Sequence, residues 1–161
     1  MGNDSVPPQS AQSAQSAQRL NSVSGVVIGA AMEVHRHLGP GLLESTYEAC
    51  LAHELQTRGI EAVTQVALPV IYKGQRLDIG YRLDFVVENC LVVELKSIER
   101  FEPVHLAQML SYLRLSKYSL GLLINFNVPK LVEGIRRVAN ALPEDVQTSA
   151  FSAASAVETK R

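Results

Sequence analysis

The sequence has little of what marks several large classes of protein: long apolar runs, an excess of one charge, and cysteine. No run approaches the roughly 18 apolar residues of a membrane-spanning helix, and the N-terminus lacks the charged start and apolar core of a signal peptide. We therefore expect a cytoplasmic protein with no membrane partner. The chain has 15 Lys and Arg residues and 16 Asp and Glu residues, for a net charge of -1. Because the chain as a whole is not basic, any binding of nucleic acid requires a local basic patch.

The two cysteines, Cys50 and Cys90, lie in separate apolar stretches without the spacing of metal ligands. Such cysteines are typical of small buried side chains in a reducing compartment, so we expect no disulfide. The remaining composition is that of a globular protein. With 161 residues, 47% of them hydrophobic, the chain is long enough for one domain with a substantial core.

Composition divides the chain into three parts. Residues 1–20 are of low complexity and repeat Gln-Ser-Ala with a period of three, which fits neither helix packing nor strand alternation. We expect this part to be a disordered tail. Residues 21–142 carry the periodic patterns of a folded domain. Residues 143–161 are rich in Ala and Ser, and we expect a flexible C-terminal tail.

Within the domain, apolar periodicity and turn residues predict a mixed α/β sheet with helices on its faces. Pro69 suggests that the first strand lies at the sheet edge. The run 119–126 is almost continuously apolar, which is typical of a strand buried on both faces. The expected elements are helices at 22–38 and 42–57, strands at 66–72, 77–87 and 90–96, a helix at 103–115, the strand at 119–126, and a helix from Pro129 to Leu142.

The most informative stretch places charged side chains inside two apolar strands. The runs Leu83–Val87 and Cys90–Leu95 are separated by Glu88-Asn89, a pair suited to a tight hairpin turn. Side chains alternate along a strand, so Glu94 and Lys96 point to the same face. If the two runs pair around this turn, Asp84 lies opposite the Val93-Glu94 region.

Two carboxylates about 4 Å apart repel each other by roughly 4 kcal/mol at an effective dielectric constant of 20, so one of them would normally be protonated. A divalent cation removes this conflict, and Mg²⁺ often binds through one or two carboxylates together with water and phosphate. The ammonium group of Lys96 could then orient an attacking water. The alternative is that Glu94 and Lys96 form an ordinary solvated ion pair.

Other polar residues have simple structural explanations. His35 and His37 fit the last turn of the first helix, as solvated partners of the helix dipole, and Glu44 fits the first turn of the next helix for the same reason. Tyr47 lies three residues after Glu44, on the same helix face. In the later helix, His105, Gln108 and Tyr112 follow one face, where they could tie the helix to the sheet.

The sequence also resembles a known family. Gly41, Glu44 and Tyr47 match the signature of the GxxExxY protein family, which is similar to the PD-(D/E)XK nuclease superfamily. The resemblance runs from about Val26 to Ala141, and it includes Pro103-Val104-His105 and the segment from Leu122 to Pro129. It implies a restriction-endonuclease-like core of mixed sheet with flanking helices.

The resemblance also implies roles for individual residues. Asp84, Glu94 and Glu44 would be metal-binding acids, with Mg²⁺ or Mn²⁺ as the cofactor, and Lys96 would be the catalytic lysine. Gln108 and Tyr112 match a Gln-x-x-x-Tyr motif of exonuclease-type branches, and we treat them, with Tyr47, as auxiliary. Leu83 stands where the superfamily often has proline before the first acid.

The leading functional prediction is a magnesium-dependent nuclease that hydrolyses phosphodiester bonds of DNA, with RNA as a possible substrate. The alternative is a catalytically silent module on the same fold that binds nucleic acid or a protein partner, including a second copy of the chain. A toxin or defence component acting with a separate partner is a third interpretation. Five basic residues are available for a local patch, or belong to ordinary solvated surface: Arg100, Arg114, Lys117, Arg136 and Arg137.

Overall fold

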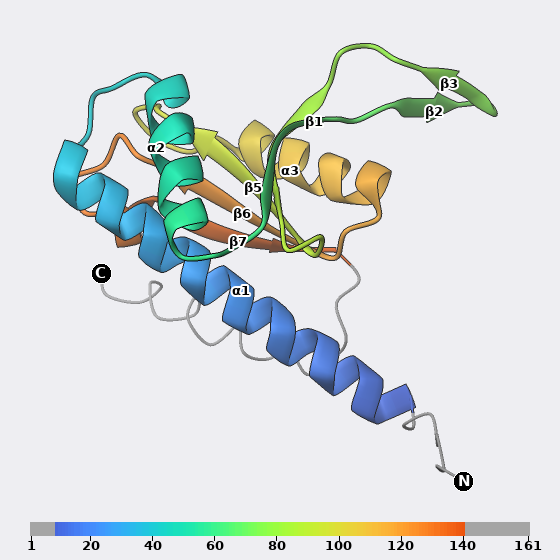
Figure 1. The fold of residues 1–161 in the computed structure, drawn as a ribbon. Helices are drawn as coiled ribbons and strands as arrows, with labels where there is room; N and C mark the ends of the chain where they lie inside the picture. Colours follow the sequence, from blue (N-terminus) through green and yellow to red (C-terminus); the bar gives the residue numbers. More distant parts are fainter. Residues whose placement is uncertain (1–8, 141–161) are drawn as a thin grey trace, which may run out of the picture.

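The computed structural model describes residues 9–140, with side chains from residue 16 onward, and its centre is a five-stranded sheet (Figure 1). Helices α1 and α2 cover one face of this sheet and α3 covers the other. The elements are α1 (Gln9–Leu38), α2 (Glu44–Thr57), β1 (Ala62–Ala67), β2 (Val70–Tyr72), β3 (Gln75–Leu77), β4 (Arg82–Val87), β5 (Leu91–Lys96), α3 (Pro103–Ser116), β6 (Leu120–Asn125), a 3₁₀ turn η1 (Leu131–Gly134) and β7 (Ile135–Ala139).

The sheet is mixed, with strand order β1-β4-β5-β6-β7. Strands β1, β4 and β5 pair antiparallel, as do β6 and β7, whereas β5 and β6 are parallel. Parallel neighbours require a crossover connection, and α3 supplies it between β5 and β6. The expected mixed α/β sheet with flanking helices is confirmed.

The alternation of side chains along β5 divides the core into two layers. Leu91, Val93 and Leu95 face α1 and α2, whereas Val92 faces α3, where it packs in one cluster with Met109. All six residues of β6 are buried, which confirms the expected strand with both faces covered. Glu94 belongs to the same face of β5 as Val92, so the sheet directs this carboxylate toward the α3 side.

Helix α1 begins at Gln9, earlier than the expected start at Ser22. The prediction of a disordered tail is therefore wrong from Gln9 onward. The physical reason is tertiary packing: Ala17 and Leu20 extend the apolar stripe of α1 and are buried in the core, which compensates for a composition that is poor in apolar residues. The rest of the expected tails, residues 1–8 and 143–161, lies outside the described residues.

The helix expected from Pro129 to Leu142 is also wrong over its described part. The chain forms the short turn η1 and then strand β7, which pairs antiparallel with β6. The apolar spacing of Leu131, Ile135 and Val138 fits a helix, but the buried strand β6 would leave its outer backbone edge without hydrogen-bond partners. Pairing with β7 satisfies this edge, and long-range pairing therefore overrides the local pattern.

The expected strand 66–72 is interrupted at Leu68-Pro69, after the edge strand β1. Beyond this point β2 and β3 form a separate two-stranded hairpin that projects away from the main sheet (Figure 1). Its turn, Lys73-Gly74, was expected. Both residues have positive φ, 49° and 78°, as a type I′ hairpin turn requires.

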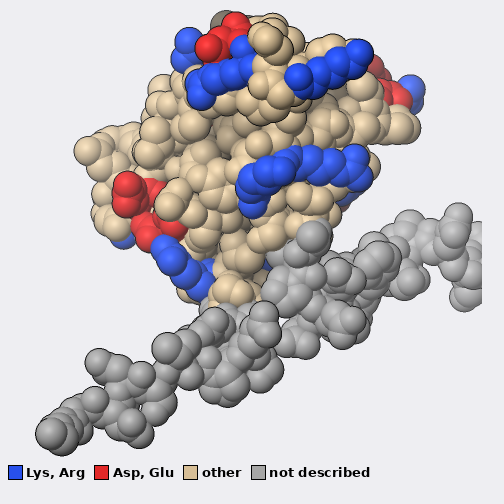
Figure 2. Space-filling model, turned by 90° about the vertical axis from the view of Figure 1, so that its right-hand side faces the viewer, with Lys and Arg blue, Asp and Glu red and all other residues tan. Residues whose placement is uncertain are grey.

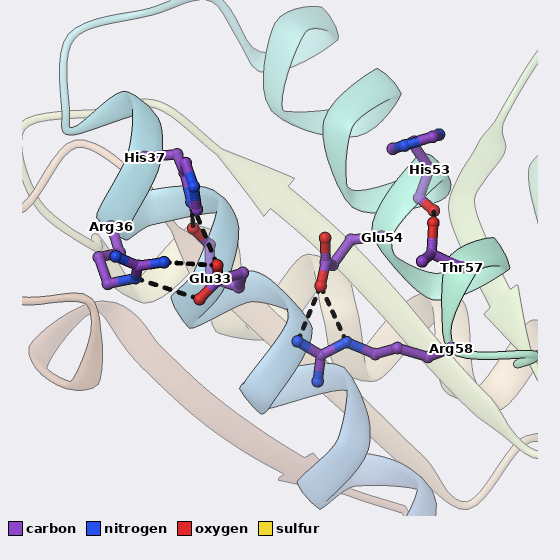
Figure 3. A network of polar contacts seen from close by, with 7 residues as sticks. All are labelled: Glu33, Arg36, His37, His53, Glu54, Thr57 and Arg58. Carbon is purple, nitrogen blue, oxygen red and sulfur yellow. Dashed lines mark hydrogen bonds and ion pairs between the residues drawn. The ribbon is translucent and has the colours of Figure 1, made fainter.

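The polar contacts drawn in Figure 3 each join residues of the same helix, α1 or α2. Glu33 binds Arg36 and His37 within α1, and Glu54 binds Arg58 within α2. Such exposed pairs each contribute little to stability. His35 differs from the expectation of a solvated side chain, because its Nε2 lies 2.9 Å from the carbonyl oxygen of Val128 and its ring is half-buried. None of the helices in the described part of the chain is long and apolar enough to cross a membrane.

Candidate functional site

The hairpin of β4 and β5 brings the two predicted acids together. Its register pairs Phe85 with Val93 and Val87 with Leu91, so the next position places Asp84 opposite Glu94, as predicted. The turn forms where it was expected: Glu88 and Asn89 both have positive φ. Regular strand pairing stops at Phe85, and the two carboxylates lie where the strands begin to separate.

Beyond that point the two carboxylates accept hydrogen bonds from backbone N–H groups of the opposite strand. The backbone N–H of Leu95 donates a 2.8 Å hydrogen bond to Oδ2 of Asp84, and the N–H of Asp84 donates a 3.2 Å bond to Oε1 of Glu94. Each carboxylate is thus fixed by the main chain of the opposite strand. One oxygen of each group has no such bond, so the pair can bind a further partner without losing its positioning.

The electrostatics of this pair are those of two acids in an apolar setting. Glu94 is only 5% exposed, and burial raises its pKa to about 8, with the charge of Asp84 as the next contribution. Burial also raises the pKa of Asp84. At neutral pH the pair therefore holds a proton, as the repulsion between adjacent carboxylates predicts.

Lys96 lies two residues after Glu94 at the end of β5, on the same strand face and half-buried. Its positive charge lowers the pKa values of both Asp84 and Glu94, in opposition to the effect of burial. The cation is therefore within electrostatic reach of both carboxylates. The three residues that the hairpin was predicted to bring together do form one group.

Glu44, the first residue of α2, reaches the same end of β5 from a different part of the chain. Its Oε1 accepts a 3.0 Å hydrogen bond from the backbone N–H of Ser97, and the Ser97 hydroxyl donates to the carbonyl oxygen of Leu42 at 2.6 Å. These bonds join the start of α2 to the residue after Lys96. The charge of Glu44 also raises the pKa of Glu94, which places it at the border of the acidic pair.

The donor set of the site fits a hard divalent cation. Asp84 and Glu94 offer carboxylate oxygens, and a cation between them would offset the repulsion and the burial that raise their pKa values. Among residues 16–140 there is no group of three or more His, Cys, Asp and Glu side chains placed to hold a metal. Two carboxylates supply only part of a coordination shell, and Mg²⁺ is commonly bound by one or two carboxylates with water in its other positions.

Tyr47 lies away from the acids and supports the loop before Glu44. Its hydroxyl donates a 2.7 Å bond to the carbonyl oxygen of Gly39 and accepts a 3.1 Å bond from the N–H of Leu42. The ring is fully buried and stacks on Phe126 at a centroid distance of 4.3 Å. The tyrosine therefore holds the loop that leads into α2.

Gln108 and Tyr112 lie on the side of α3 that covers the site. The Gln108 amide donates a 2.7 Å hydrogen bond to the Tyr112 hydroxyl. Burial, followed by the charge of Glu94, raises the pKa of Tyr112. His105, expected on the same face, instead accepts the N–H of Glu102 through Nδ1 and completes a capping box at the start of α3.

Two further residues at the site were not predicted. Glu48, one helical turn after Glu44, raises the pKa of Asp84 and accepts a 2.9 Å bond from Gln65. Its i,i+4 spacing from Glu44 is the signal that could have found it. Asn125 is 1% exposed and is the register partner of Lys96; its side chain bonds the N–H and carbonyl groups of Ile98 at 3.1 and 2.8 Å. The sequence signal for Asn125 is that it is a single polar amide residue at the end of an otherwise apolar strand.

Three of the five basic residues considered for a local patch have partners within the protein. Arg100 pairs with Glu102, the guanidinium of Arg136 lies over the ring of Phe101, and Arg137 donates to the side chain of Asn21.

Comparisons with known proteins give a family and one structural relative. No curated protein matches the sequence. A solved structure titled "Crystal structure of SSO0001" is similar to the chain with 20% identity and a TM-score of 0.49; the match covers 73% of this chain and 61% of the length of that one. A family model described as the PD-(D/E)XK nuclease superfamily matches residues 21–138. The five-stranded mixed sheet with flanking helices agrees with the restriction-endonuclease-like core expected for that superfamily. With most of its length matched, the chain belongs to the PD-(D/E)XK nuclease superfamily.

Proposed function

We propose that the chain is a metal-dependent nuclease of the GxxExxY group that hydrolyses phosphodiester bonds of DNA. The observation that carries this proposal is the placement of Asp84 opposite Glu94, each fixed by a backbone N–H of the other strand, with Lys96 beside them. A protein rarely keeps two carboxylates in an apolar setting unless they bind a cation or share a proton.

Asp84 and Glu94 would hold Mg²⁺ or Mn²⁺, and Glu44 would orient water at the border of the site. When bound, the cation would withdraw charge from the phosphate and make water a better nucleophile. Lys96 would orient the attacking water and offset the negative charge that develops on the phosphate oxygens. Tyr47 would act as a positioning residue for Glu44.

In the proposed reaction the water oxygen forms a bond to phosphorus while the bond from phosphorus to one ester oxygen breaks. The departing oxygen gains a proton and becomes a free hydroxyl group, and the other product is a phosphate monoester. The protein forms no covalent bond to the substrate. Its contribution is therefore the positioning of reactants and the stabilisation of charge.

The test is cleavage of labelled single-stranded, linear and circular DNA, with Mg²⁺ or Mn²⁺, by wild type and Lys96→Ala prepared in parallel. We expect Lys96→Ala to fold but to lose about 10²- to 10³-fold in rate, the usual effect of removing one oriented charged donor. Arg19→Ala serves as the control, because Arg19 is an exposed cation that binds Glu88 at the turn end of the β4–β5 hairpin. Full metal-dependent activity in Lys96→Ala would refute the mechanism.

One observation favours a second candidate, a silent module that binds nucleic acid without cutting it. Residues 16–140 contain no cluster of three acidic or other ligand side chains placed for a metal, and Glu44 is engaged by the N–H of Ser97. Under this alternative, nucleic acid binds equally well with or without divalent metal, and Asp84→Asn leaves that binding unchanged. A metal requirement for binding or cleavage that Asp84→Asn removes would exclude the silent module.

A further inference from the structure

The β2–β3 hairpin has no part in the site described above, and its composition is unusual for a surface loop. We call residues 70–82 the arm: it comprises β2, β3, the chain that returns to the main sheet, and Arg82, the first residue of β4. Figure 1 shows it extending beyond the sheet and helices. Every residue from 71 to 82 is exposed, so the arm does not pack its side chains into the body of the protein.

The arm exposes large apolar and aromatic side chains. Ile71, Tyr72, Ile79 and Tyr81 are 60%, 59%, 56% and 45% exposed. They fall within eleven consecutive residues. A contiguous exposed apolar set on an element that adds nothing to the core indicates a binding surface.

The arm carries a net positive charge, although the chain as a whole does not. Lys73, Arg76 and Arg82 against Asp78 give the arm a net charge of +2, while the whole chain carries -1. The ammonium group of Lys73 lies 5.4 Å from the centroid of the Tyr72 ring, which places a cation beside an exposed aromatic surface. Figure 2 views the side of the molecule on which the arm projects; Lys and Arg side chains lie along its upper edge, with Asp or Glu side chains beside them.

The base of the arm leads directly to the acidic pair. The N–H of Leu68 donates a 2.8 Å hydrogen bond to the carbonyl oxygen of Tyr81, which closes the arm where it leaves the sheet. The Tyr81 ring lies 6.0 Å from that of Tyr112, on the helix α3 that covers the site. Asp84 follows Tyr81 by three residues and Arg82 by two. A contact between two aromatic rings therefore links the base of the arm to the helix that covers the site.

We propose that the arm binds a single-stranded segment of nucleic acid and delivers it to Asp84 and Glu94. Bases stack on the rings of Tyr72 and Tyr81, and phosphates face Lys73. This inference rests on the proposed nuclease function, because it assigns the substrate form of that site.

Two features of the arm favour a single strand of nucleic acid over a duplex or a second copy of the chain. Exposed rings beside cations suit unpaired bases, since every base has a face for stacking and a duplex conceals it. A second copy of the chain would place one arm of charge +2 against another, whereas a polyanion complements this charge.

The test measures equilibrium binding in EDTA, where no metal-dependent cleavage occurs. The probes are a fluorescein-labelled single strand of mixed sequence and the blunt duplex of the same sequence, followed by fluorescence anisotropy. We expect wild type to prefer the single strand and Tyr72→Ala to weaken that binding about ten-fold or more. Tyr72→Phe keeps the ring and should bind as wild type does. Lys73→Ala should reduce the slope of log affinity against log salt by about 0.7.

Each other outcome has a definite meaning. Equal single-strand binding by wild type, Tyr72→Ala and Lys73→Ala would overturn the inference, as would no binding at all or a preference for the duplex. Sedimentation that shows a dimer dissociated by Tyr72→Ala would assign the arm to self-association and also overturn it.

The two proposals can fail separately. Binding through the arm by a wild type that never cleaves would refute the nuclease function and leave the arm inference standing. Cleavage of a single strand by Tyr72→Ala with unchanged KM would refute the arm inference alone.

Discussion

Replacing Glu94 by glutamine should stabilise the metal-free protein at neutral pH. The substitution keeps the side-chain volume and the oxygen that accepts the N–H of Asp84, and it removes the ionisable group. An unfolded glutamate titrates near 4.5, whereas Glu94 titrates at about 8 in the folded chain, mainly because it is buried. At pH 7 folding therefore requires a proton that the unfolded chain has released, a cost of about 3 kcal/mol.

The sign of the pH dependence follows from the raised pKa. Between about pH 4.5 and 8 the folded state binds more protons than the unfolded state, so the stability of wild type falls as pH rises through this window. The raised pKa of Asp84 acts in the same direction. Glu94→Gln should lose much of this dependence, and its advantage over wild type should vanish below pH 4.5.

Urea unfolding in EDTA, followed by circular dichroism below, within and above this pH window, measures the effect. Glu99→Gln is the matched control, because Glu99 is exposed and a change there should leave the pH dependence intact. Adding Mg²⁺ should stabilise wild type but not Glu94→Gln, since a bound ion favours the ionised pair. A wild-type stability that is flat between pH 5 and 8, or a Glu94→Gln protein less stable than wild type at pH 8, would refute the reasoning.

Two further predictions concern the scaffold of the site. Tyr47→Phe removes the hydroxyl that bonds the carbonyl of Gly39, so we expect a loss of about 1–2 kcal/mol in unfolding free energy, together with reduced cleavage if this loop positions α2. An unchanged melting temperature would contradict that role. In Gly134→Ala a new Cβ would collide with the backbone oxygen of Asn125, and we expect a loss on the order of 2 kcal/mol or more in thermal unfolding. Gly25→Ala, in open space on α1, should be neutral or stabilising by up to about 1 kcal/mol, and an equal effect of both changes would refute the steric argument.

The sequence predicted the central hairpin well because its determinants are local. Glu88-Asn89 specifies a turn, and strict alternation then decides which residues share a face. From these two facts alone Asp84 was placed opposite the Val93-Glu94 region, and the register of the structure puts it opposite Glu94. The Lys73-Gly74 turn was predictable for the same reason, because its backbone geometry depends on the two residues themselves.

The errors arose where distant parts of the chain decide the outcome. The segment after Pro129 has a spacing that fits a helix, yet the open edge of β6 recruits it as β7. The start of α1 is set by the burial of Ala17 and Leu20 against the rest of the core, which composition cannot show. Similarly, the hydrogen bond from the N–H of Ser97 to Glu44 joins residues far apart in sequence, so local periodicity suggested only a helix-dipole role for this acid.

The proposed function depends above all on a divalent cation that Asp84 and Glu94 hold together. Electron paramagnetic resonance of Mn²⁺ titrated into the protein, with and without a nuclease-resistant phosphorothioate strand, counts bound ions directly. We predict binding by wild type that is lost in both Asp84→Asn and Glu94→Gln and retained in Glu99→Gln. Binding that survives in both of the first two variants, or no binding by wild type even with the strand present, would contradict the account.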